Sequence, residues 1–93
     1  MTVGVLVLHV GIADSRSLKD KRSVLLRLFG RIRRVFNVSM SEVGDRNIHD
    51  RAVIAVASVN SDKAYLNATL LTVKHEVEMM SDIVLSDFTI EFL

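Results

Sequence analysis

The sequence contains no cysteine, no proline and no tryptophan, and only five of its 93 residues are aromatic. Without cysteine there are no disulfide bonds, thiolate nucleophiles or cysteine-bound metals, as is typical of proteins from a reducing compartment. The longest apolar run, Val3–Val10, contains His9 and is far shorter than the roughly 20 residues of a membrane helix. Residues 1–12 lack the basic region and cleavage site of a secretory signal. We therefore expect a cytoplasmic protein with no membrane partner.

Motifs for catalysis and metal binding are also lacking. His9, His49 and His75 lie on different expected elements and have no metal-ligand spacing. There is no glycine-rich phosphate loop, and no serine stands in a nucleophile motif. Asp45, His49 and Asp50 cluster in one loop, a pattern more typical of a solvated turn than of an active site. We therefore expect no catalytic residue, no metal, no cofactor and no enzyme activity.

What the sequence does contain is enough hydrophobic material for a core: 49% of the residues are hydrophobic and 25% are charged. No linker, repeat or low-complexity tract divides the chain, so we expect a single domain over residues 1–93. Helical periodicity over residues 18–36 and 62–80 predicts two helices. Ser17 and Asp20 form a capping-box pattern before the first helix, and residues 60–62 offer N-caps for the second.

Four segments have the character of strands. Residues 2–12 and 50–59 are apolar at both odd and even positions, that is, on both sides of the strand, which is typical of central strands. Residues 37–44 suit an edge strand. Residues 83–92 alternate, which predicts Val84, Ser86, Phe88, Ile90 and Phe92 on one side and Ile83, Leu85, Asp87, Thr89 and Glu91 on the other. The order β-α-β-β-α-β predicts an α+β, ferredoxin-like sandwich: a four-stranded antiparallel sheet with two helices on one face.

One face of such a sheet carries no helix, yet the central strands are apolar there. An uncovered apolar patch favours an interaction site. We predict a homo-oligomer whose interface contains Val3, Val5, Val7 and His9. The second helix carries a further outward stripe, either scattered exposed residues or a second contact surface: Ala64, Ala68, Leu71, His75 and Met79.

Eight of the twelve basic residues lie between residues 15 and 34, with Asp20 as the only acid. Exposed basic side chains neutralise phosphates and release counterions, and a helix N-terminus favours anions. The candidate nucleic-acid or anion contacts are Arg16, Lys19, Arg22, Arg27, Arg31, Arg33 and Arg34. The alternative is a solvated face opposite acids of the other half, since residues 1–46 carry a net charge of +5 and residues 47–93 a net charge of −4.

Lys21 differs from these residues because it falls within the apolar arc of its helix. It must extend to solvent or meet a carboxylate, for which Glu42 and Glu91 are candidates. None of the aromatic residues lies on the two central strands, so the base-stacking platform of an RNA-recognition motif is missing. Any RNA would instead be held by its backbone on the first helix.

The stretch Ser-Leu-Lys-Asp-Lys-Arg at residues 17–22 resembles the YlxP-like family of small bacterial proteins. Residues 36–39 (Phe-Asn-Val-Ser), 42–43 (Glu-Val) and 51–52 (Arg-Ala) fit it too, so the resemblance extends to about residue 60. It implies a ferredoxin-like fold and a bacterial, cytoplasmic protein. Genes of this family often lie beside those for translation initiation and ribosome maturation factors, which implies a role near RNA or the ribosome. No established activity or catalytic residue comes with the family.

Two functional hypotheses follow. The first is a non-enzymatic protein that binds RNA or a ribosomal subunit through its basic first helix. The second is a homo-oligomeric regulatory or small-ligand-binding module that uses the open sheet face.

Overall fold

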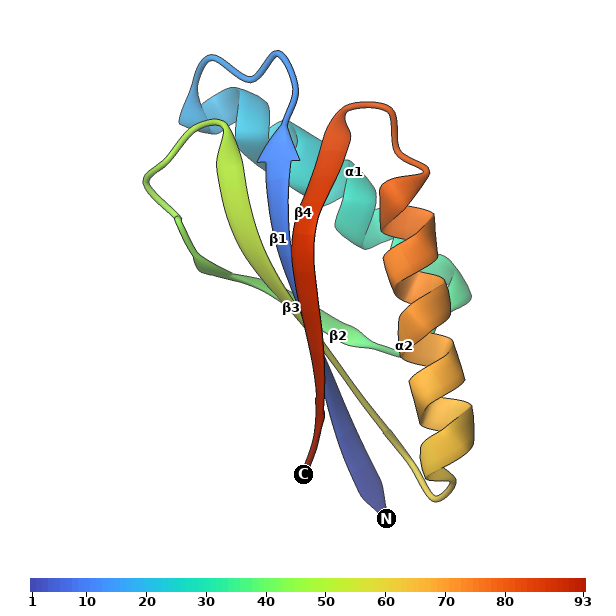
Figure 1. Ribbon diagram of the computed structural model, residues 1–93. Coiled ribbons are helices and arrows are strands. Elements are labelled where there is room, and N and C mark those ends of the chain that lie inside the picture. Colours follow the sequence, from blue (N-terminus) through green and yellow to red (C-terminus); the bar gives the residue numbers. More distant parts are fainter.

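Two helices pack on one side of a four-stranded sheet in the computed structural model, which describes all 93 residues (Figure 1). The elements are β1 (Thr2–Ile12), α1 (Leu18–Val35), β2 (Ser39–Gly44), β3 (Arg51–Asn60), α2 (Lys63–Glu78) and β4 (Ile83–Phe92). The sheet order is β2-β3-β1-β4 and every pairing is antiparallel. The predicted ferredoxin-like α+β fold is therefore confirmed. Neither helix is long and apolar enough to cross a membrane.

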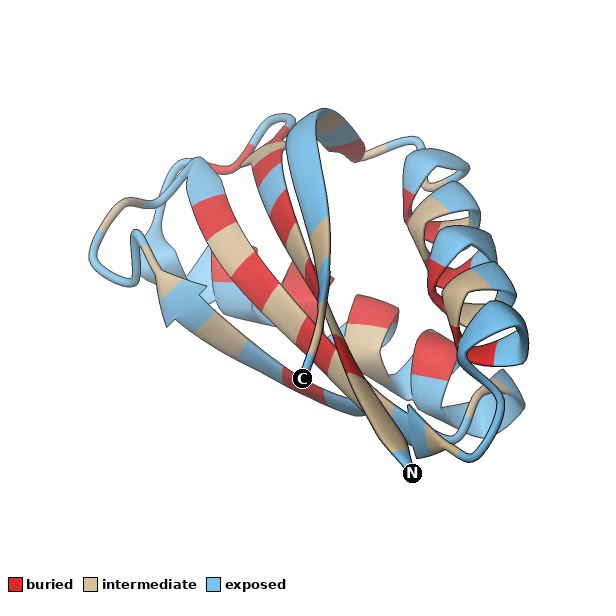
Figure 2. Cartoon of the chain, turned by 60° about the horizontal axis from the view of Figure 1, so that its bottom comes forward, coloured by how far each residue is buried: buried red, intermediate tan, exposed pale blue.

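Buried residues alternate with partly exposed ones along β1 and β3, which are the central strands (Figure 2). Leu6 lies opposite Val56 and Leu8 opposite Ile54, and all four are fully buried beneath the helices. The helices complete the core with Val24, Leu25, Leu28 and Ile32 of α1 and with Leu66, Leu70, Val73 and Val77 of α2. The alternation shows why these strands are apolar in both sets: one set fills the core, and the other forms the helix-free face.

Gly4 lets α2 approach the sheet closely. A Cβ atom at this position would lie 2.8 Å from Leu70 Cδ1 and 3.1 Å from Leu66 Cδ2. A larger residue in β1 would therefore push α2 away from the sheet.

The predicted alternation of β4 was wrong in its first part because the strand contains a bulge. His9 of β1 pairs with Asp87, but the next residue, Val10, pairs with Leu85. Ser86 is left without a partner in the ladder, and its hydroxyl donates to the carbonyl oxygen of His9 at 3.0 Å. One extra residue in a strand reverses the facing of every residue beyond it.

The bulge places Ile83 and Leu85 on the helix side of the sheet together with Phe88, not on the opposite side. Ile83 is 4% exposed and belongs to the core. The predicted bounds of β1 and β4 are exact, and those of the other elements differ from the structure by at most two residues. The second helix, for example, begins at Lys63 because Asp62 is its N-cap and accepts from the backbone N–H of Tyr65 at 3.1 Å.

Candidate functional site

The first turn of α1 is closed by its own side chains. The Ser17 hydroxyl accepts from the backbone N–H of Asp20 at 3.0 Å, and the Asp20 carboxylate accepts from the backbone N–H of Arg16 at 3.0 Å. This is a capping box whose return hydrogen bond reaches one residue before the N-cap. Because the Asp20 carboxylate already lies at the helix N-terminus, the basic side chains around it, rather than the helix end, are available to an external anion.

Lys21 extends from α1 into the loop that joins β2 and β3, and it is only 2% exposed. Its ammonium group donates hydrogen bonds to the carbonyl oxygens of Asp45 at 2.9 Å, Arg46 at 3.3 Å and Arg51 at 3.0 Å. It also lies 2.7 Å from Glu42 Oε2. Of the two carboxylates predicted from sequence, the one on β2 is therefore the partner.

The three hydrogens of the Lys21 ammonium match the three carbonyl oxygens. The buried Glu42 Oε2 atom lies 2.7 Å from the same ammonium group, closer than any of the three carbonyl oxygens, and Lys21 is its one polar partner. Asp45, whose carbonyl receives the shortest of the three hydrogen bonds, has a left-handed backbone with φ of 57°. Lys21 thus fixes a tight turn of the loop against the helix.

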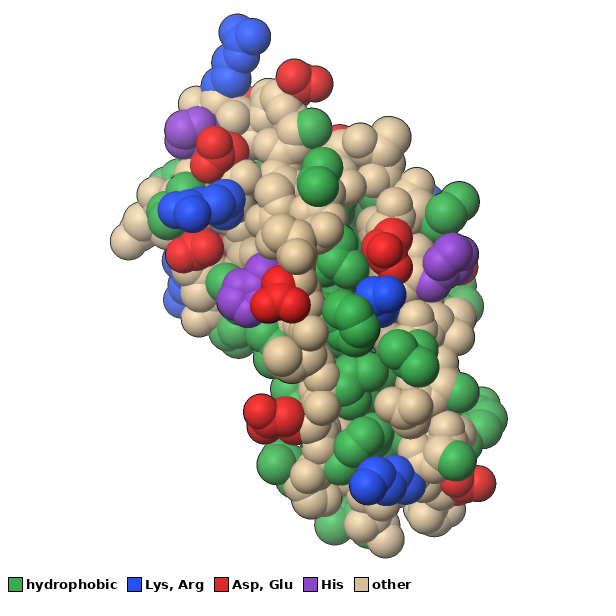
Figure 3. Space-filling model, viewed as in Figure 1, with side chains coloured by type: hydrophobic (Ala, Val, Ile, Leu, Met, Phe, Trp, Pro, Cys, Tyr) green, Lys and Arg blue, Asp and Glu red, His purple; other side chains and the backbone are tan.

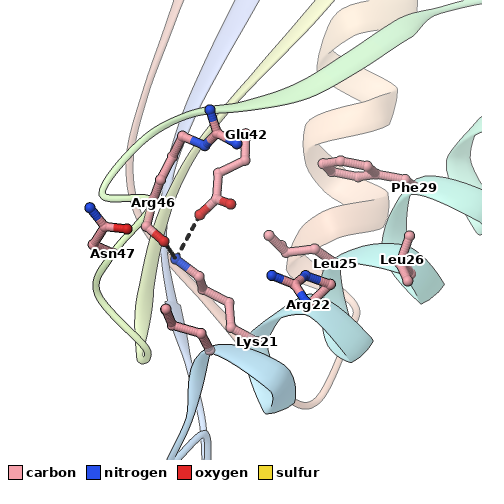
Figure 4. Close-up of a pocket in the computed structure, with 9 residues that line it drawn as sticks. Lys21, Arg22, Leu25, Leu26, Phe29, Glu42, Arg46 and Asn47 are labelled. Atoms are coloured by element: carbon pink, nitrogen blue, oxygen red, sulfur yellow. Dashed lines mark hydrogen bonds and ion pairs between the residues drawn. The ribbon is translucent and has the colours of Figure 1, made fainter.

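A pocket of about 410 Å³ opens beside this lysine, between α1 and the β2–β3 loop (Figure 4). The helix contributes a largely apolar wall, and β2 and the loop contribute a polar one. The lining residues are Leu18, Lys21, Arg22, Leu25, Leu26, Phe29, Glu42, Arg46 and Asn47. The motif residues Leu18, Lys21 and Arg22 therefore all lie at this pocket.

Two arginines of the pocket have free guanidinium groups. Neither Arg22 nor Arg46 forms an ion pair, and neither side chain donates a hydrogen bond within the protein. Arg16 and Lys19, at the start of the same helix, are also exposed and without acidic partners. The charges of Lys21 and Glu42 cancel, so these four residues are the basic side chains at this end of α1 and in the β2–β3 loop that have no ion-pair partner. We call them the free cations.

Two of the arginines predicted to contact phosphate face acids of the other half of the chain. Arg27 Nη2 lies 2.8 Å from Asp82 Oδ2, and Arg31 Nη2 lies 3.6 Å from Glu76 Oε2. These ion pairs connect α1 with α2 and with the turn before β4. Two positive charges of the first half of the chain are therefore neutralised by acids of the second half.

Arg33 and Arg34 are also engaged, although not by acids. Arg33 donates to the carbonyl oxygen of Met40 on β2 at 2.9 Å, and its guanidinium carbon lies 5.3 Å from the centre of the Phe29 ring. Arg34 donates to the carbonyl oxygen of Gly30 at 3.3 Å. Of the seven basic candidates, four therefore make contacts within the protein, and the other three lie at the pocket end of α1: Arg16, Lys19 and Arg22.

Arg46 and Asn47 were not among the residues predicted from sequence. They belong to the loop, where neither helical nor strand periodicity applies. Arg46 is brought to α1 by the hydrogen bond from Lys21 to its backbone carbonyl. The one available indication was Lys21, whose place in the apolar arc required a polar partner nearby.

The four residues of the predicted oligomer interface lie together on the helix-free face of β1. Val3, Val5 and Val7 are half-buried and His9 is exposed. Their partners in the central strand β3 are Val59, Ala57, Ala55 and Val53. We call this row of side chains the aliphatic stripe: Val3, Val5, Val7, Val53, Ala55 and Ala57. On the other side of β1, β4 contributes Asp87, Thr89 and Glu91 to the same face.

The outward stripe of α2 is exposed, as its spacing predicts, with Leu71 at 41% and Met79 at 65% exposure. Hydrophobic side chains also gather between β4 and α2, with basic side chains among them (Figure 3). Lys74 Nζ lies 4.4 Å from the centre of the Phe88 ring, and Lys63 Nζ lies 4.8 Å from that of Phe92. These two lysines therefore cover aromatic rings rather than standing free.

The structure is similar to that of the de novo designed protein Foldit4, with a TM-score of 0.56 and 11% identity over 100% of this chain and 97% of that one. That likeness concerns the fold alone. The sequence is 35% identical over 72 residues to the "Uncharacterized protein YlxP" of Bacillus subtilis (strain 168), covering 77% of this chain and 78% of the relative. Residues 3–90 match the family model described as "Protein of unknown function (DUF503)", and the chain belongs to this family.

Proposed function

We propose that the protein is a non-enzymatic RNA-binding protein of the bacterial cytoplasm, and that it holds the RNA backbone at the pocket end of α1. The observation that carries this proposal is the set of free cations: Arg16, Lys19, Arg22 and Arg46 have no acidic partner. Arg27 and Arg31, by contrast, are paired within the molecule. The gene neighbourhood implied by the family resemblance supports RNA over other polyanions.

The mechanism is release of counterions. Each Lys or Arg that neutralises a phosphate of a single strand displaces about 0.7 of a condensed cation, so four contacts give a slope of roughly −3 in log affinity against log salt. Arg22 and Arg46 lie on opposite walls of one pocket and offer planar guanidinium groups to phosphate oxygens. The backbone would therefore cross the mouth of the pocket.

The test compares two pairs of arginines that carry the same charge. Binding of a labelled RNA and of ribosomal subunits is measured by fluorescence anisotropy and co-sedimentation over a range of salt concentrations. Arg22→Gln/Arg46→Gln is expected to weaken binding and to reduce the salt slope by about 0.7 for each contact removed. Arg27→Gln/Arg31→Gln removes the same charge from paired positions and is expected to leave the slope unchanged.

Absence of RNA and subunit binding at low salt would refute the proposal. Equal losses from both double variants would show that net charge, and not the free cations, is responsible. Binding to ribosomal subunits but not to free RNA would identify the ribosome as the partner and would keep the same contact residues.

A second candidate function, favoured by the aliphatic stripe, is a homo-oligomeric regulatory or ligand-binding module. Uncovered aliphatic side chains on a central part of a sheet are typical of an interface. Light scattering at micromolar concentration is expected to give twice the chain mass if the stripe is buried between subunits. Val5→Lys should then restore a monomer, whereas Leu71→Lys on α2 should not. A monomeric wild-type protein would exclude this candidate.

A further inference from the structure

We infer that the pocket beside Lys21 takes one unstacked base of a single-stranded RNA while Arg22 and Arg46 hold neighbouring phosphates. The inference rests on the proposed function and makes it more specific, because it selects single strands over duplexes. Its basis is the combination, in one pocket, of an apolar wall with two free guanidinium groups.

A surface that binds only phosphates does not need an apolar wall. Leu26 is 65% exposed and Leu18 is 40% exposed, although both lie on a helix that has a separate buried face. Leu25 and Phe29 continue this wall toward the core. Exposed hydrophobic side chains that line a concave site are typical of ligand contact. The volume of about 410 Å³ lies within the roughly 300–1,000 Å³ usual for small-ligand pockets.

Phe29 is the one aromatic residue among the lining side chains. Proteins that bind single strands stack bases on aromatic rings and on guanidinium planes, and such stacking tolerates every base. The guanidinium carbon of Arg33 lies over the Phe29 ring, 5.3 Å from its centre, so a base would stack on the part of the ring that Arg33 leaves uncovered. The central strands lack aromatic residues, so a base finds its stacking surface here and not on the sheet face.

The charges of the pocket favour a nucleotide over a neutral apolar ligand. Lys21 and Glu42 compensate each other, which leaves the charges of Arg22 and Arg46 to attract phosphates. The Asn47 amide offers both donors and an acceptor to a base edge. Glu42 Oε2 is already buried against Lys21, so it does not select a base. A strong preference for single strands with a weak choice of base is therefore expected.

The experiment uses a short RNA that contains one 2-aminopurine, whose fluorescence rises when the base leaves its stacked neighbours. Titration with the wild-type protein is expected to raise the fluorescence of the single strand, while a duplex of the same length should bind more weakly and show no rise. Replacing the central nucleotide by an abasic one is expected to weaken binding at least about five-fold, the lower end of the stacking contribution.

Two exposed leucines supply a matched pair of variants. Leu26→Ser alters the wall of the pocket and is expected to weaken binding about five-fold without changing the salt slope, because no phosphate contact is lost. Leu71→Ser makes the same change on α2, outside the pocket, and should have no effect. Both side chains are exposed, so both variants are expected to fold.

The outcomes separate this inference from the proposed function. Suppose that RNA binding depends on Arg22 and Arg46, but that the abasic strand and the duplex bind as tightly as the intact single strand and Leu26→Ser binds as tightly as the wild type. The pocket then does not hold a base, and the inference is overturned. The proposed function would stand in that case. If no RNA binds at low salt, the proposed function itself fails.

Discussion

Lys21 on α1 places its ammonium group 2.7 Å from the carboxylate of Glu42 on β2. The same ammonium group holds three carbonyl oxygens of the β2–β3 loop and its flanking strand. At the point where α1, the edge strand β2 and the loop meet, the contact is thus made by a buried lysine and not by apolar side chains.

Lys21→Met should strongly destabilise the protein. The substitution leaves three carbonyl oxygens of the loop and of β3 without their donor and Glu42 without its counter-charge. Removing one partner of a buried ion pair typically costs about 3–5 kcal/mol. Urea denaturation of the variant and the wild type measures the difference.

Lys19→Met is the control, since Lys19 lies two residues earlier on the same helix and is exposed. The double variant Lys21→Met/Glu42→Gln should lose less stability than the sum of its single variants, because it leaves no unpaired charge. A loss below about 1 kcal/mol for Lys21→Met would show that the ion pair and its hydrogen bonds are dispensable.

Gly30→Ala should stabilise the protein. Gly30 lies within α1 on its exposed side, and an added Cβ would meet no atom within 4 Å. Alanine in place of glycine in a helix typically contributes about 0.5–1 kcal/mol. Thermal unfolding measures the gain. Gly4→Ala is the contrasting change, expected to lower the melting temperature because its Cβ would crowd Leu70.

Deletion of Ser86 should preserve the fold. Without Ser86, Leu85 would be the direct chain neighbour of Asp87. Asp87 would still lie opposite His9, and Leu85 would still lie opposite Val10 on the core side. The deletion removes the hydrogen bond to the carbonyl of His9, for which a cost of about 1 kcal/mol is usual. Circular dichroism and urea denaturation report the outcome.

Deletion of Thr89 is the matched control, because it removes a paired residue from the same strand. It would place either the residues before it or those after it on the wrong face, so a large loss of stability is expected. Similar stability of the two deletion variants would contradict the assignment of Ser86 as the bulge.

The ion pair between Arg27 and Asp82 should contribute little to stability. Their side chains are 62% and 28% exposed, and ion pairs of this kind typically contribute about 0–1 kcal/mol. A double-mutant cycle with Arg27→Gln and Asp82→Asn measures the coupling energy. A value well above this range would mean that the contact between α1 and the turn before β4 is a major element of the fold.

The fold was predictable because each element obeys a local rule. The helical spacing of the apolar residues and the two apolar sets of the central strands depend on neighbours along the chain, and both predictions held. The bulge at Ser86 was not predictable in this way. A strand with one extra residue has the same composition as a regular strand, and the buried position of Ile83 becomes evident only when β4 is paired with β1.

The candidate site was predictable only in part. The helical spacing placed Arg22 and Arg27 on the polar side of α1 and Lys21 on the apolar side, which is correct for all three. It could not show that Arg27 meets Asp82 while Arg22 remains free, because Asp82 is separated from α1 by almost half the chain. Arg46 joins the pocket through its backbone carbonyl, a contact available to any residue type.

The hydrogen bonds of Lys21 also bear on the entropy of binding. The loop and the start of β3 are already joined to the helix by three carbonyl contacts, so the two walls of the pocket are held in place without a ligand. A ligand that enters such a site loses its own freedom but does not have to order the protein, and pre-organised sites retain more of their contact energy as affinity. Rapid association in a single kinetic step, with no slow closing of the loop, is the behaviour that this arrangement favours.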